Sequence, residues 1–79
     1  MGEIKFINYG YREQGDDAMT VACEIGGEFA GMYRGYFDGN IVRLYPVKRV
    51  RADAPYRATV APEYIENRLG QEIDPKHCA

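Results

Sequence analysis

Apolar and polar residues alternate along much of the chain with the period of two that β-strands show. The alternation is clearest over residues 18–25, where Met19, Val21, Cys23 and Ile25 would lie on one face and Ala18, Thr20, Ala22 and Glu24 on the other. The other strands predicted from the sequence are residues 3–11, 28–38, 41–51 and 56–60. Pro46 should bend or interrupt the strand 41–51, because proline has no N–H to donate to a neighbouring strand.

Glycine-containing pairs predict the turns between these strands. Gly26-Gly27 fits a two-residue hairpin turn, in which both positions tolerate positive φ, and Gly39-Asn40 fits the hairpin turn that begins with glycine. Residues 12–17 and 52–55 are polar or turn-forming and predict loops.

The C-terminal part predicts one short helix. Pro62 suits a first helical turn, Tyr64, Ile65 and Leu69 form an apolar stripe, and Gly70 suits a helix end. Ala61 is a poor N-cap residue, and a helix of about two turns must dock on the sheet to form. Residues 71–79 are expected to be a loosely held tail.

The predicted fold class is therefore α+β, mainly β. We expect an antiparallel meander of four to five strands followed by one short helix, all within a single domain of 79 residues. A small barrel is the favoured arrangement, and an open two-layer sheet is the alternative.

The expected turn at 39–40 predicts an exposed pattern of arginine and tyrosine. It sets Arg34 opposite Tyr45 and Tyr36 opposite Arg43, and further along it sets Ala30 opposite Arg49 and Glu28 opposite Arg51. A turn shifted by one residue would place Arg34 against Arg43, an unfavourable pair of like charges. Arginine and tyrosine are frequent at binding hot spots, and on a strand surface they also contact bases and phosphates. The candidate partner-binding residues are Arg34, Tyr36, Arg43, Tyr45 and Arg49; ordinary solvent-exposed cation–π pairs are the alternative interpretation.

Aromatic residues and glycines alternate along the strand 28–38. Phe29, Gly31, Tyr33, Gly35 and Phe37 should share one face with Ala18, Thr20, Ala22 and Glu24. Packing of the rings over the glycines is the favoured explanation, and an aromatic-lined groove is the alternative. The same register puts Met19, Val21, Cys23 and Ile25 on the arginine–tyrosine face. Apolar groups on both faces predict either closure into a barrel or pairing of two molecules.

The charged residues are distributed unevenly along the chain. The net charge is −2, with residues 43–57 carrying five basic residues and one acidic residue between two acidic flanks. This distribution permits a local basic patch and argues against mimicry of DNA by the whole molecule. The start of the chain lacks the apolar run of a signal peptide and no segment is long enough to cross a bilayer, so the expected location is cytoplasmic.

No residues combine into a recognisable catalytic or metal site. Cys23 is interpreted as a core thiol, and a bridge between Cys23 and Cys78 is disfavoured. His77 with Cys78 offers two metal ligands where a site needs three or four. Gly10 and Gly15 have the spacing of a phosphate-binding loop, but Asp16 and Asp17 stand where that motif requires Lys and Ser or Thr. We therefore expect no enzyme activity, no cofactor and no metal.

Three hypotheses for function follow. The first is a stand-alone module that binds a protein partner stoichiometrically as an adaptor or inhibitor, and a phage or mobile-element inhibitor of host defence would fit the small size. The second is a nucleic-acid-binding protein that uses the arginine–tyrosine face. The third is an enzyme or small-ligand protein whose site forms at a dimer interface.

Overall fold

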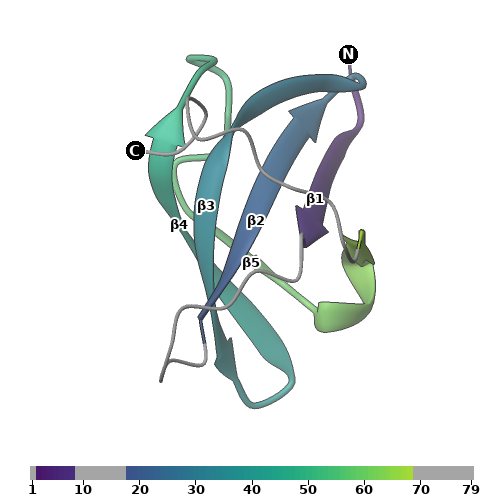
Figure 1. The fold of residues 1–79 in the computed structure, drawn as a ribbon, viewed down its shortest axis with the longest axis vertical. Coiled ribbons are helices and arrows are strands. Elements are labelled where there is room, and N and C mark those ends of the chain that lie inside the picture. Colours follow the sequence, from purple (N-terminus) through teal and green to yellow (C-terminus); the bar gives the residue numbers. More distant parts are fainter. Residues whose placement is uncertain (1, 9–17, 69–79) are drawn as a thin grey trace.

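The computed structural model describes residues 2–8 and 18–68 of the 79-residue chain. These residues form one six-stranded sheet in the order β5-β4-β3-β2-β1-β6, which curls into a half-barrel (Figure 1). The strands are β1 (Ile4–Asn8), β2 (Ala18–Ile25), β3 (Glu28–Asp38), β4 (Ile41–Arg49), β5 (Ala58–Val60) and β6 (Ile65–Asn67). The predicted mainly β architecture is confirmed, and the sheet has one more strand than the sequence indicated.

Both predicted hairpin turns are present. Gly26 and Gly27 have φ values of 61° and 82°, which a two-residue turn of this type needs and which L residues with a Cβ rarely adopt. Gly39 has a φ of 63° and joins β3 to β4. The turns place Ile25 opposite Glu28 and Asp38 opposite Ile41.

The predicted C-terminal helix is wrong. Pro62–Tyr64 form a single 3₁₀ turn, η1, and the chain then becomes extended as β6. Ala61 makes no side-chain cap hydrogen bond, so nothing compensates for the orphan N–H groups of a longer helix. In β6, Ile65 instead lies beside Phe6 of β1 in parallel register and packs against the core. Leu69 and Gly70 lie outside the described residues.

The segment from β5 to β6 closes much of the remaining side of the half-barrel. β5 pairs with β4 at one edge of the sheet, and β6 pairs with β1 at the other. Only Ala61 and η1 connect them, so the chain crosses directly from one edge to the other (Figure 1). This arrangement encloses an apolar interior without a second sheet.

Two irregularities decide which side chains enter that interior. Gly31 lies opposite Cys23 and Phe29 lies opposite Glu24, so Ala30 is an extra residue in β3. Across the next hairpin, Tyr33 lies opposite Pro46 and Met32 opposite Lys48, so Val47 is an extra residue in β4. Each β-bulge moves the residues beyond it to the other face of the sheet.

The bulge in β3 overturns the predicted partners of the aromatic–glycine strand. Tyr33 and Gly35 lie opposite Val21 and Met19 and not beside Thr20 and Ala22, while Phe29 lies on the other face, opposite Glu24. The core on the concave side consists of Phe6, Met19, Val21, Cys23, Ile25, Ala30, Tyr33, Val42, Leu44 and Ala54. The expectation that Met19, Val21, Cys23 and Ile25 line the arginine–tyrosine face is therefore wrong.

Close packing explains Gly35, but its nearest neighbours are aliphatic side chains and not the aromatic rings that the sequence suggested. A Cβ on Gly35 would come within 2.9 Å of side-chain atoms of both Val42 and Leu44. The ring of Phe6 meets that of Tyr33 edge to face, with 6.0 Å between the centroids. A second apolar row, Ile7, Ala22 and Met32, runs across the outer face and is also buried.

Candidate binding surface

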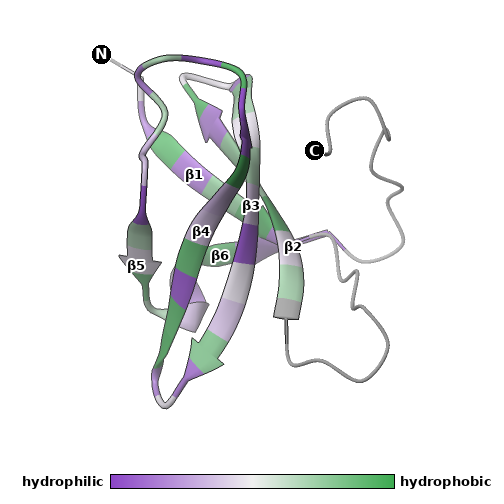
Figure 2. Ribbon diagram, turned by 90° about the vertical axis from the view of Figure 1, so that its left-hand side faces the viewer, coloured by the Kyte–Doolittle hydropathy of each residue, from purple (hydrophilic) through white to green (hydrophobic). Residues whose placement is uncertain are grey.

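The outer face of β3 and β4 carries the predicted arginine–tyrosine pattern. Arg34 lies opposite Tyr45 and Tyr36 lies opposite Arg43, as the 39–40 turn predicts. Hydrophobic and hydrophilic residues alternate visibly along both strands (Figure 2). Because successive side chains of a strand point to opposite faces, the four side chains share the face opposite the core residues Tyr33, Val42 and Leu44.

Arg49 does not belong to this row. The bulge at Val47 sets it opposite Gly31 and not Ala30, and Lys48 takes the place on the outer face. Arg49 therefore lies at the concave side of the rim, where its charge partly offsets the raised pKa of Tyr33. The predicted pairing of Glu28 with Arg51 is absent from the strand ladder, although the two side chains approach to 3.8 Å.

Ring contacts connect the outer face to the rim. The rings of Tyr36 and Tyr45 meet edge to face with centroids 5.9 Å apart. The guanidinium of Arg57 lies 5.9 Å from the centroid of Tyr45 and 5.9 Å from that of Tyr56. Arg49 completes the series at 5.5 Å from the centroid of Tyr56. We refer to Tyr36, Tyr45, Arg57, Tyr56 and Arg49 as the tyrosine–arginine chain.

Sequence reasoning missed Tyr56 and Arg57. The sequence predicted both as part of a strand over residues 56–60, but β5 begins only at Ala58. Tyr56 and Arg57 therefore lie in the loop after β4, where strand register does not determine their neighbours. The available signal was the excess of basic residues over 43–57, which ends at Arg57. The structure brings this basic segment back beside its own beginning, because Arg57 reaches the ring of Tyr45 in β4.

The arginines of this region differ in what already binds them. Nε of Arg43 donates to Oδ2 of Asp38 at 2.7 Å, so one carboxylate partly neutralises it. Arg49 donates from Nη2 to the carbonyl oxygen of Ala52. Arg34, Arg43 and Lys48 place positive charge on the outer face of β3 and β4, where Asp38 pairs with Arg43.

Exposed apolar and aromatic residues lie on β4 and in the loop that follows it. Tyr45, Val47, Val50 and Tyr56 are 39%, 44%, 53% and 63% exposed, values high enough to offer contact area to a partner. Pro46, the bulge at Val47 and the charge of Lys48 make this stretch of β4 a poor template for an added strand. A partner would therefore contact its side chains and not extend the sheet.

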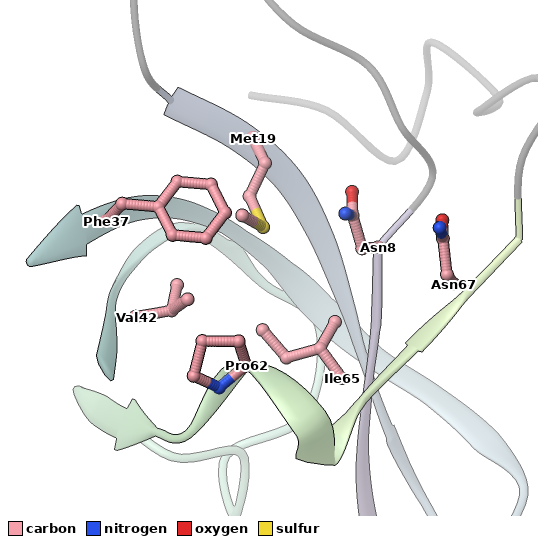
Figure 3. A pocket seen from close by; sticks show the side chains of 7 residues that line it. All are labelled: Asn8, Met19, Phe37, Val42, Pro62, Ile65 and Asn67. Atoms are coloured by element: carbon pink, nitrogen blue, oxygen red, sulfur yellow. The ribbon is translucent and has the colours of Figure 1, made fainter. Parts of the chain in front are cut away.

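A small pocket opens at the other end of the half-barrel. Its volume is about 210 Å³, and it is lined by Asn8, Met19, Phe37, Val42, Pro62, Ile65 and Asn67 (Figure 3). The amides of Asn8 and Asn67 lie together on one side and the apolar groups on the other (Figure 3). Sites for drug-sized ligands usually occupy about 300–1,000 Å³. This pocket is smaller, so the exposed surface is the stronger candidate.

Two ionisable groups in the core are held neutral. Cys23 is a buried free thiol, as predicted, and burial raises its pKa to about 11, with the charge of Arg51 opposing that rise. Burial also raises the pKa of Tyr33, whose hydroxyl has no hydrogen-bond partner among the described residues. A thiol with a raised pKa is a poor nucleophile near neutral pH.

Most of the residues weighed as a phosphate-binding loop or a metal site lie outside the part of the chain that the structure describes. Gly10, Gly15, Asp16, Asp17, His77 and Cys78 lie outside the described residues. Within residues 2–8 and 18–68, His, Cys, Asp and Glu form no group of three or more that could hold a metal ion. The same ranges contain no helix with the length and apolar character needed to span a membrane.

Comparisons of the chain with protein-family models, with curated proteins and with solved structures found no match.

Proposed function

We propose that this protein is a cytoplasmic binding module that acts stoichiometrically on a protein partner, and that it contacts this partner through the tyrosine–arginine chain. The observation that carries the proposal is the continuous contact series from the half-buried Tyr36 through the exposed Tyr45 and Tyr56 to Arg49, with Val47 and Val50 also exposed in the same stretch of chain. Tyrosine and arginine, together with tryptophan, are enriched among the residues that contribute most to protein–protein affinity. Mutual ring and cation–π contacts hold these side chains in place before binding, which lowers the entropy cost of association.

The geometry favours a protein over a nucleic acid. Single strands bind on open ring faces where successive bases stack. Here Tyr36 and Tyr45 meet at an interplanar angle of 67°, and guanidinium groups lie over the rings of Tyr45 and Tyr56. Arg43 is already paired with Asp38, which reduces the charge available to phosphates. The exposed valines add apolar area that a phosphate backbone would not use.

The proposal is tested by capture from the native host with the tagged full chain. We expect a protein to be recovered in near-stoichiometric amount, with the yield unchanged by nuclease and little changed between low and moderate salt. Nucleic-acid binding, by contrast, weakens steeply with salt because it releases counterions from the phosphates. Recovery that disappears with nuclease or moderate salt would replace the proposal with the nucleic-acid hypothesis.

Variants connect the capture to the surface. Tyr45→Ala combined with Tyr56→Ala removes two exposed rings of the chain, whereas Tyr64→Ala removes a more exposed ring from η1. The double variant should lose the partner, and the Tyr64 variant should keep it. Equal recovery by both would contradict the proposed surface.

A further inference from the structure

Arg57 differs from its neighbours in what surrounds its guanidinium. Its described contacts are the rings of Tyr45 and Tyr56, each centroid 5.9 Å from the guanidinium carbon. Within residues 2–8 and 18–68, no carboxylate or carbonyl oxygen accepts a hydrogen bond from it. Its N–H donors are therefore available to a ligand.

Other arginines in the described structure have such acceptors. Arg43 is paired with Asp38 at 2.7 Å, and Arg51 binds both carboxylate oxygens of Asp53 at 2.9 and 2.7 Å. The pairing of Arg51 with Asp53 shows the two-point geometry that a guanidinium forms with a carboxylate. Arg57 has the same donor set without the carboxylate.

The two tyrosine rings prepare Arg57 for such a ligand. A guanidinium packed against aromatic rings keeps its N–H groups in its own plane, where they can meet a carboxylate in two parallel hydrogen bonds. Contact with both rings also restricts the side chain, so less rotamer entropy is lost on binding. Arg49, on the ring of Tyr56, adds a second positive charge close by.

We propose that Arg57, positioned by Tyr45 and Tyr56, is a receptor for a carboxylate, and that it takes an Asp or Glu side chain of the protein partner. This inference rests on the proposed function and makes it more specific, since the partner must present an acidic residue beside an apolar patch that covers Val47 or Val50. A phosphate would satisfy the same donors, so the experiment includes phosphate as a competing outcome.

The test uses the full ¹⁵N-labelled chain and two polyanions, poly-L-glutamate and single-stranded oligothymidylate. We expect poly-L-glutamate to shift the Nε–Hε resonance of Arg57 in a saturable way and to bind more tightly than oligothymidylate. Arg57→Gln should weaken the binding of poly-L-glutamate about tenfold. The affinity of Arg57→Lys should lie between those of the wild type and Arg57→Gln, because lysine keeps the charge but loses the two-point geometry. Arg68→Gln is the matched control, since Arg68 lies after β6 beside Glu66.

Specific outcomes overturn the inference. Unchanged poly-L-glutamate binding by Arg57→Gln would show that Arg57 is not the receptor, and wild-type binding by Arg57→Lys would show that charge alone suffices. Tighter binding of oligothymidylate at Arg57 would assign the receptor to phosphate. If a captured partner requires Tyr45 and Tyr56 but binds the Arg57→Gln variant normally, this inference fails while the proposed function stands. If Arg57 binds poly-L-glutamate but the host yields no partner, the receptor stands and the proposed function fails.

Discussion

Arg51 donates a hydrogen bond from Nη1 to the carbonyl oxygen of Ile25 at 3.1 Å, which ties the loop after β4 to the end of β2. Its other nitrogens bind the carboxylate of Asp53 within the same loop. Ala54, three residues further on, is buried in the core cluster and donates its N–H to the carbonyl oxygen of Arg51. One arginine therefore holds the loop over the end of the half-barrel.

Replacing Arg51 with alanine should lower the free energy of unfolding by about 1.5–3 kcal/mol, the range for hydrogen bonds to charged groups. Two effects contribute to this loss of stability. The variant lacks the hydrogen bond to the Ile25 carbonyl, and the loop that buries Ala54 is no longer held in place. Urea unfolding of the variant measures it, with Arg68→Ala as the control because its ion pair with Glu66 is half exposed. Equal losses in the two variants would show that the loop does not depend on Arg51.

The buried thiol of Cys23 predicts how stability depends on alkaline pH. Burial raises its pKa from 9.0 to about 11, so between these values the unfolded chain has released a proton that the folded chain retains. Stability should therefore be complete below about pH 9 and fall by about 2–3 kcal/mol as the pH rises to about 11. Urea unfolding at a series of pH values measures this fall.

Cys23→Ala is the control for this dependence. It should remove most of the fall between about pH 9 and 11 and leave a contribution from Tyr33, whose pKa burial also raises. An identical pH dependence in the wild type and the variant would mean that the thiol is not shielded as the structure indicates.

Tyr33→Phe should increase the free energy of unfolding by about 1–2 kcal/mol. The hydroxyl is buried and has no hydrogen-bond partner among the described residues, and such a group costs about 1–3 kcal/mol relative to its hydrated state. The variant keeps the ring and its edge-to-face contact with Phe6. Thermal and urea unfolding measure the change; a loss of stability would show that the hydroxyl has a partner such as an ordered water.

The order of β1 to β5, the two hairpin turns and the Arg34–Tyr45 pair follow from the sequence because they depend on local signals. Alternation defines the strands, and Gly26, Gly27 and Gly39 define the reversals. These signals determine pairing close to each turn. The predicted pairs of Arg34 and Tyr36 are correct for this reason.

The errors begin at the two bulges. Gly31 and Pro46 lie next to the two bulges and are residue types often found there, but the alternating pattern does not identify Ala30 or Val47 as the extra residue. The bulge at Ala30 is favoured by long-range packing: Ala30 enters the core, and its carbonyl oxygen accepts the N–H groups of both Val50 and Arg51. A pattern with a strict period of two cannot contain that information.

The missed strand β6 has a similar origin. Residues 62–69 have the composition of a short helix, but Ile65 gains more by pairing beside Phe6 and packing on the core than a helix of about two turns would provide. Tyr56 and Arg57 were missed because their neighbours are set by the return of a loop and not by strand register.

Chemical footprinting of tyrosine gives the most direct test of the binding surface, using the wild-type chain with and without the captured partner. Tyr45, Tyr56 and Tyr64 are 39%, 63% and 75% exposed, so all three should react with a nitrating reagent in the free protein. In the complex, we predict that labelling of Tyr45 and Tyr56 falls severalfold while Tyr64 reacts as before. Protection of Tyr64 with continued labelling of Tyr45 and Tyr56 would contradict the account.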